Sequence, residues 1–185
     1  TSVTGVQNFA RPFSTQVTNQ LTKPSDKATQ RTTKKLFGTY VTSQSSPVQP
    51  ERFTGYHTGV GFETFPEEAT KDVQINAICT GKLQLKEVAA GYGGVIVQDC
   101  QIGGSPVTVV YGHMRISSMK VALGDDVNKG QKLGLLGTGS SSETDGERKH
   151  LHLDIHKGTA INIAGYVQSK SELSNWIDPC IYLCR

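Results

Sequence analysis

The sequence lacks any long apolar stretch. No run of residues approaches the roughly 18 apolar residues that a membrane-spanning helix requires, and only 36% of the 185 residues are hydrophobic. The sequence also contains no HExxH, GxSxG or GxxxxGK[ST] motif. These are common signatures of proteases, esterases and nucleotide hydrolases, so the usual forms of these enzymes are not indicated. A membrane-spanning helix is excluded.

A CxxC pair is also missing, although the chain has four cysteines. Without such a pair, a structural zinc knuckle is not indicated. Cys79 and Cys100 lie on segments that we expect to be hairpin neighbours, and Cys180 and Cys184 are close enough in sequence to close a small loop. Disulfides in an oxidising compartment and buried free thiols in a reducing one both remain open.

Charge is unevenly distributed along the chain. The net charge is +3, but residues 1–35 contain six basic residues and one acidic residue, a net charge of +5. Residues 36–185 contain 13 basic and 15 acidic residues, a net charge of −2, so no nucleic-acid-binding surface is expected on the fold. Residues 1–35 also include 17 Ser, Thr, Asn or Gln residues. We therefore predict a polar, basic N-terminal arm over 1–35 and one domain over 36–185. The chain begins at Thr1 without a signal-like segment, and we expect Thr1 to follow processing or trimming.

Short strands separated by glycine turns dominate the rest of the chain. Alternating or continuous apolar residues predict strands in 73–79, 83–85, 95–97, 107–111, 121–136 and 150–156. Only residues 169–176 predict a helix, and a short one. This pattern is typical of a mainly β fold, an antiparallel sheet or sandwich with short peripheral helices.

The clearest alternation is HLHLDIH at 150–156. In a strand, its leucines and isoleucine would face a core, and its three histidines and aspartate would share the other face. Polar residues facing solvent would satisfy this pattern. A zinc hydrolase, in contrast, needs neutral imidazoles, a carboxylate and an open position for water. With His57 and His113 beside other predicted strands, the sheet would bring histidines from three strands together.

Four segments occur in the order found in LytM/lysostaphin-type peptidases, the M23 family. They are GYHTGVGFE (55–63), YGH (111–113), VALGDDVNKGQKLGLLGTG (121–139) and HLHLDIH (150–156). The sequence resembles this family from about residue 36 to residue 183. The resemblance implies a mainly β fold of the LytM type and Zn²⁺-dependent hydrolysis of peptide bonds in bacterial peptidoglycan. It also implies peptidoglycan peptides as partners and an extracytoplasmic location, secreted or in the cell envelope.

The resemblance also implies roles for the histidines. His57 and His152 match the family's zinc ligands, and His113 and His150 match its catalytic histidines that do not bind the metal. The catalytic pair helps to deprotonate the metal-bound water and to stabilise charge on the carbonyl oxygen.

Tyr56 and Tyr111 border two of the motifs. They are candidate substrate-binding residues, with packing in the core as the alternative. The charged, turn-prone segment 143–149 leads directly into 150–156, so it is expected to be a solvated loop or a wall of the groove. Residues 121–134 also resemble part of lipoyl and biotinyl carrier domains, but a carrier gives no reason for the set of histidines.

One position departs from the family. The family motif His-x-x-x-Asp supplies the third metal ligand, and Gly61 occupies the aspartate position here. Loss of the only anionic ligand weakens metal retention. Three explanations are open. In the first, another carboxylate replaces the ligand. Glu63 is one candidate, because it has the same strand parity as Gly61, although its Cα lies about 6.5–7 Å farther along the strand. Asp154 is the other candidate. Alternatively, a working enzyme has lost one ligand, or the domain binds cell wall or a partner and regulates wall hydrolysis without cutting.

Overall fold

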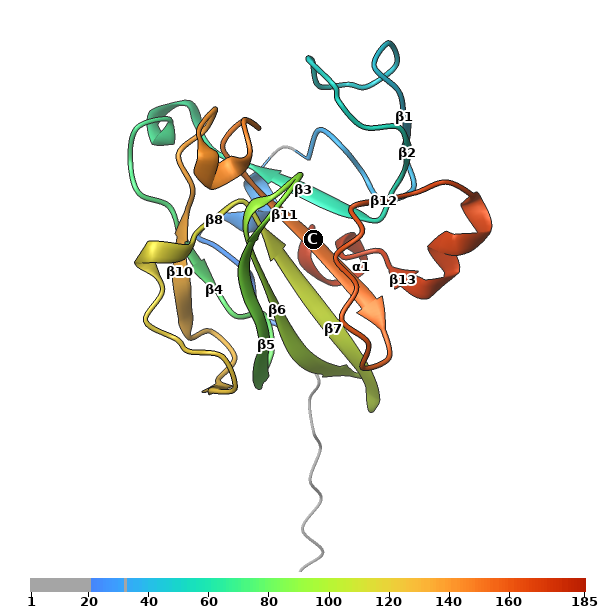
Figure 1. The fold of residues 1–185 in the computed structure, drawn as a ribbon. Coiled ribbons are helices and arrows are strands. Elements are labelled where there is room, and N and C mark those ends of the chain that lie inside the picture. The colour runs from blue at the N-terminus through green and yellow to red at the C-terminus, as the bar shows by residue number, and fades with distance from the viewer. Residues whose placement is uncertain (1–20, 32) are drawn as a thin grey trace, which may run out of the picture.

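The structure is a computed structural model that describes residues 21–31 and 33–185. Residues 1–20 and 32 of the predicted arm lie outside the described residues. The paired strands of the described part are antiparallel, and its helices are short and peripheral (Figure 1). The predicted mainly β fold class is confirmed.

A central sheet carries most of the fold. Its strands follow the order β13-β11-β7-β6-β5-β9, and β3 also pairs with β11. The strands are β3 (Gly59–Glu63), β5 (Gly81–Ala89), β6 (Gly93–Ile102), β7 (Ser105–Gly112), β9 (Asp126–Val127), β11 (His150–Lys157) and β13 (Trp176–Ile177). Gly103 and Gly104 join β6 to β7 with φ angles of 59° and 80°, a left-handed turn that glycine accepts without strain.

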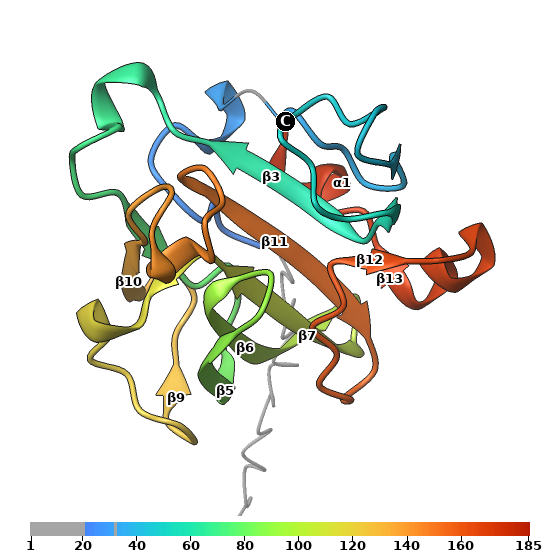
Figure 2. The ribbon, with the colours of Figure 1, turned by 45° about the horizontal axis from the view of Figure 1, so that its top comes forward.

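Two small sheets flank the central one (Figure 2). One has the order β4-β10-β8 and the other the order β1-β2-β12. Their strands are β4 (Gln74–Asn76), β10 (Lys132–Leu136), β8 (Met114–Arg115), β1 (Tyr40–Val41), β2 (Gly55–His57) and β12 (Tyr166–Val167). The helices of the described part are α1 (Cys180–Leu183) and 3₁₀ helices at Ala28–Gln30, Pro66–Glu68, Ile116–Ser118, Ser142–Thr144 and Lys170–Asn175. The last of these coincides with the short helix that the sequence predicts.

The alternation in β11 divides the core from the other face of the sheet. Leu151, Leu153 and Ile155 are almost fully buried in the main hydrophobic cluster, as predicted. Burying side chains of this size stabilises a fold by about 1.5–3 kcal/mol each. His150 and His152 lie on the opposite face, which is also covered, so polar side chains are buried there as well.

Both cysteine pairs are disulfide-bonded. Cys79 is bonded to Cys100 across a Cα–Cα distance of 5.9 Å, and Cys180 to Cys184 across 4.5 Å. The first joins the segment before β5 to β6, and the second closes the turn of α1. The structure therefore resolves the open alternative in favour of disulfides.

The described residues before position 36 pack against the domain. Thr22 N donates to Ile78 O at 2.9 Å, and buried Arg31 pairs with Glu68 at 2.7 Å. The side chain of Lys35 forms an almost fully buried ion pair with Glu51. These contacts involve only residues 21–31 and 33–35 of the predicted arm. The domain boundary at residue 36 therefore remains a prediction. No helix in the described part has the length and apolar character to cross a bilayer.

Candidate functional site

The register of β11 places the motif residues side by side. β11 runs between β3 and β7, so His152 lies opposite Gly61 on one side and opposite Gly112 on the other. Two pairs farther along, His150 lies opposite Glu63. The residue that replaces the family's aspartate is therefore the direct neighbour of a predicted zinc ligand.

A cavity of about 350 Å³ opens over this part of the sheet. Its lining includes Gly61 and all four histidines to which the resemblance assigns roles, namely His57, His113, His150 and His152. These side chains come from β2, the end of β7 and β11. The sheet thus brings the predicted histidines together in one cleft.

His57 and His152 form the closest pair. His57 Nε2 lies 3.2 Å from His152 Nδ1. The other nitrogen of His57, Nδ1, lies 3.3 Å from Leu36 O, and His152 Nε2 lies 2.8 Å from Asp154 Oδ2. Both of these partners accept hydrogen bonds, so each ring places its proton there and turns an unprotonated nitrogen toward the other ring.

His113 and His150 face each other with ring centroids 4.4 Å apart. His113 Nδ1 donates to Tyr92 O at 2.9 Å, and His150 Nδ1 donates to Arg148 O at 2.9 Å. Each therefore keeps an unprotonated Nε2. His113 has a φ of 62°, a left-handed conformation that is uncommon for a residue with a side chain. This backbone turn at the end of β7 directs the ring into the cleft.

A buried network lies behind His152. Asp154 is completely buried and accepts hydrogen bonds from His152 Nε2 at 2.8 Å and from Tyr92 Oη at 3.3 Å. The close approach of Tyr92 to the sheet requires glycine at position 112, because a Cβ there would collide with the tyrosine ring. A carboxylate that accepts from a histidine fixes its tautomer and orientation, as second-shell groups do at metal sites.

Burial keeps three histidines of the cleft neutral. Burial, followed by the proximity of His152 and of the Lys35 ammonium group, holds the pKa of His57 well below its usual range. Burial and the neighbouring His113 do the same for the pKa of His150. Burial lowers the pKa of His113 to about 3, with His152 as the next cause. Neutral imidazole is the form that accepts a proton or binds a metal ion.

Glu63, a candidate substitute for the missing aspartate, is held by basic residues. The Arg148 guanidinium group donates from Nε to Glu63 Oε2 at 3.0 Å and from Nη2 to Glu63 Oε1 at 2.6 Å. Lys34 Nζ lies 3.9 Å from Glu63 Oε2. The carboxylate of Glu63 lies on the same side of β3 as Gly61. Its oxygens bind Arg148, however, so they are not directed at the histidines as a metal ligand would be.

These residues do not fit the three-ligand zinc centre of the family. Two nitrogens bound to one tetrahedral zinc lie about 3.3 Å apart, close to the 3.2 Å between His57 Nε2 and His152 Nδ1. However, the described residues contain no group of three His, Cys, Asp or Glu side chains that would hold a metal ion. Asp154, the second candidate substitute, uses Oδ2 for His152 Nε2 and Tyr92, and its Oδ1 is buried beside Gly59 without a hydrogen-bond partner among the described residues.

The two tyrosines that border the motifs lie outside the cavity lining. Tyr111 is fully buried in the core, and its hydroxyl group bonds Gln98 Oε1 at 3.0 Å and Ile78 N at 2.9 Å. Tyr56 is half-buried against Tyr40, with ring centroids 4.8 Å apart. The structure therefore places both among packing contacts. Tyr111 shares the core-facing side of β7 because it lies opposite Leu153 of β11.

The cleft lining also includes residues that sequence reasoning did not single out, among them Lys35, Tyr92, Arg148 and Tyr166. The sequence held a partial signal for Arg148, which lies in the charged segment predicted to be a solvated loop or a groove wall. Because Arg148 lines the cavity, the structure favours the interpretation of this segment as a wall of the groove. Lys35 falls in the predicted arm, and no local pattern relates it to the histidines.

Comparison with known proteins gives matches to one family. A family model described as peptidase family M23 matches residues 55–163. No match was found among curated proteins. Solved structures that share the fold include three at 16–22% identity.

The first is a putative M23 peptidase from Pseudomonas aeruginosa, 20% identical with a TM-score of 0.51; the match covers 89% of this chain and 50% of that one. The chain thus spans half the length of that protein. LytU is 22% identical with a TM-score of 0.52 over 79% of this chain and 86% of LytU. A chain of the SpoIIQ–SpoIIIAH pore-forming complex is 16% identical with a TM-score of 0.53 over 89% of this chain and 90% of that one. Since the family model covers more than half of the sequence, the chain belongs to peptidase family M23.

Proposed function

We propose that this chain is an extracytoplasmic, bacterial M23 domain that binds peptidoglycan peptides in its histidine cleft and does not hydrolyse them. The observation that carries this proposal is the Arg148–Glu63 ion pair beside Gly61. It puts a guanidinium group next to the position of the family's anionic ligand and occupies the nearest alternative carboxylate on β3.

The cleft remains suited to holding a peptide. Its volume of about 350 Å³ lies within the range of ligand-binding pockets, roughly 300–1,000 Å³. It presents unprotonated imidazole nitrogens as acceptors, and the ammonium and guanidinium groups of Lys35 and Arg148 as donors. Peptides offer the complementary amide N–H, carbonyl and carboxylate groups.

Two disulfides support an extracytoplasmic location, because such bonds persist mainly in oxidising compartments. A role in controlling wall hydrolysis through a protein partner is compatible with the fold. The SpoIIQ–SpoIIIAH complex contains this fold within an assembly of two different proteins.

Sedimentation with purified peptidoglycan tests the proposal. The chain is expected to sediment with the wall material and to release no soluble peptide, with or without added zinc chloride. Release of peptides with newly exposed amino groups by the unmodified chain would contradict it. Cleavage in a parallel sample of an active M23 peptidase would show that the substrate is cleavable.

A zinc endopeptidase is the second candidate, and the 3.2 Å separation of His57 Nε2 and His152 Nδ1 favours it. This function needs a third ligand from outside the described residues. Measuring zinc per chain after purification separates the two candidates. One zinc per chain together with peptide release supports the endopeptidase, whereas a metal-free chain that binds peptidoglycan supports the first proposal.

A further inference from the structure

We propose that Arg148 and the space beside Gly61 form a carboxylate-binding subsite, which takes the free C-terminal carboxylate of a bound peptide. The inference rests on the proposed function, since it specifies which chemical group of the peptide the cleft recognises. It requires no metal ion.

The guanidinium group of Arg148 has one edge in use, and its second edge carries a nitrogen without a partner among the described residues. A guanidinium presents five N–H donors and can bind one carboxylate on its Nε/Nη2 edge and another on its Nη1/Nη2 edge. Glu63 occupies the first edge, at 3.0 Å from Nε and 2.6 Å from Nη2. Nη1 is buried and has no hydrogen-bond partner among the described residues.

The Nη2 end of this second edge adjoins the space that Gly61 leaves. A Cβ at position 61 would lie 3.4 Å from Arg148 Nη2 and 3.1 Å from His150 Cδ2. Both Gly61 and Arg148 line the cavity, so a ligand oxygen a few tenths of an ångström closer to Nη2 than this point would accept a hydrogen bond from the guanidinium group. A carboxylate is the planar group that matches such an edge, and the resulting charge-assisted hydrogen bonds are strong.

The surrounding charges are compatible with an anion. Lys35 also lines the cavity, and its ammonium group uses two of its three donors, on Glu51 and on Tyr166 Oη at 2.9 Å. The acidic residue of the lining, Glu147, is paired with Arg52 at 3.1 Å. The histidines add no negative charge, and the partly enclosed position strengthens each polar contact.

Calorimetric titration of the full chain in EDTA tests the subsite. The probes are diacetyl-Lys-D-Ala-D-Ala with a free carboxylate and the same peptide as its C-terminal amide. We expect the acid to bind roughly tenfold more tightly than the amide, as two charge-assisted hydrogen bonds would give. Arg148→Gln is expected to remove this preference.

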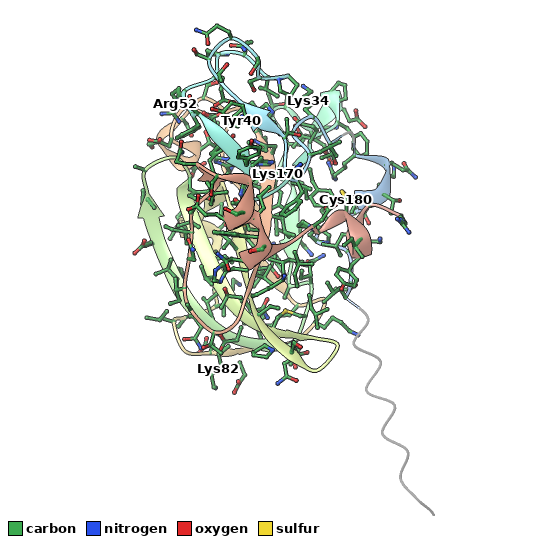
Figure 3. The ribbon with its side chains drawn as sticks, turned by 90° about the vertical axis from the view of Figure 1, so that its right-hand side faces the viewer. Lys34, Tyr40, Arg52, Lys82, Lys170 and Cys180 are labelled. Atoms are coloured by element: carbon green, nitrogen blue, oxygen red, sulfur yellow. A yellow bond between two sulfur atoms is a disulfide. The ribbon has the colours of Figure 1, made fainter. Side chains whose placement is uncertain are left out.

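Two further variants complete the design. Gly61→Asp places a tethered carboxylate in the subsite and keeps the Arg148–Glu63 pair, so it also removes the preference even if Arg148→Gln folds poorly. Lys82→Gln removes a positive charge from an exposed ion pair at the opposite end of the molecule from Lys34 and Arg52 (Figure 3), and it is expected to retain the preference. Thermal unfolding of each variant checks that it is folded.

The outcomes distinguish the subsite from the proposed function. Equal affinity for acid and amide in a chain that sediments with peptidoglycan overturns the subsite alone. Failure to sediment overturns the proposed function. Titration with sodium acetate separates a small-anion site from a peptide site: acetate binding that Arg148→Gln abolishes, without any preference for the acid peptide, overturns the assignment to a peptide terminus.

Discussion

His57 Nε2 and His152 Nδ1 face each other across 3.2 Å, and the acceptor at the far side of each ring assigns the ring proton to the other nitrogen. The protons are on the opposite nitrogens, directed at Leu36 O and Asp154 Oδ2. A hydrogen bond between the rings would need the His57 proton on Nε2, which would leave Leu36 O without its donor, or a second proton on one ring. Burial opposes the second proton, since it holds the pKa of His57 well below its usual range. The pair is thus arranged as two ligands of a cation, in a cleft whose described residues lack the third.

This relationship predicts the tautomers of the cleft in the metal-free chain. We expect His57, His113 and His150 to carry their proton on Nδ1 and His152 to carry it on Nε2. Nitrogen-15 chemical shifts of the imidazoles in an EDTA-treated sample measure this directly. We also expect no titration of His113 between pH 5 and 8, because burial lowers its pKa to about 3. An Nε2-protonated His57, or a His113 that titrates near pH 6.5, would contradict the assignment.

The second prediction restores the missing ligand. Gly61→Asp introduces a carboxylate directly beside His152, and we expect zinc affinity to rise at least roughly tenfold because an anionic third ligand completes the set. The new Cβ requires shifts of a few tenths of an ångström from His150 and Arg148. Zinc per chain after dialysis against a competing chelator provides the measurement.

Gly61→Asn is the matched control for that change. It has nearly the same shape but no negative charge, so it should gain much less zinc affinity. If Gly61→Asp binds zinc yet never releases peptide from peptidoglycan, the explanation that one lost ligand separates this chain from a working enzyme is wrong. Arg148 is expected to compete with the metal for the introduced carboxylate, so this pairing limits the gain.

The sequence predicts those features of this site that depend on neighbouring residues of one strand, and it does not predict contacts between residues far apart in the chain. The alternation in 150–156 predicts which residues of β11 face the core, and strand parity predicts that Glu63 shares a face with Gly61. Neither pattern reveals that Arg148 binds Glu63, because residues 63 and 148 meet only through the pairing of β3 with β11. The same holds for Tyr111: its position beside a motif does not reveal that its ring is buried in the core.

The third prediction concerns the buried hydroxyl group of Tyr92. Tyr92→Phe removes a donor to Asp154 Oδ2 at 3.3 Å while leaving the ring in place. The free energy of unfolding should fall by about 1 kcal/mol, the usual net value of one hydrogen bond. Urea denaturation measures the change. Tyr40→Phe, at a tyrosine that is 47% exposed, is the control and should shift stability by far less. Equal effects of the two substitutions would rule out the network behind His152 as a source of stability.

The fourth prediction uses the pH dependence of Glu68. The hydrogen bond from Arg31 is the main cause that holds the pKa of this carboxyl below its usual range. A carboxyl whose pKa is lowered by folding adds stability above its unfolded pKa, and this contribution is lost as the pH falls through the folded pKa. We therefore expect Glu68→Gln to flatten the loss of stability below about pH 4.5. Its exposed neighbour supplies the control Glu67→Gln, which should leave the acid limb of the stability curve unchanged.

The fifth prediction tests whether residues before position 36 belong to the folded domain. Arg31 is 7% exposed, and its guanidinium group donates to Glu68 Oε2 at 2.7 Å, Glu63 O at 3.0 Å and Ser25 Oγ at 3.1 Å. Arg31→Met keeps the apolar stem but removes the donor to these acceptors. The free energy of unfolding should therefore fall by about 3 kcal/mol, as when one partner of a buried ion pair is removed. Lys82→Met, at an exposed pair, should cost little. If the two substitutions have equally small effects in urea denaturation, the contacts of Arg31 contribute nothing to the stability of the domain, and the predicted boundary at residue 36 is favoured.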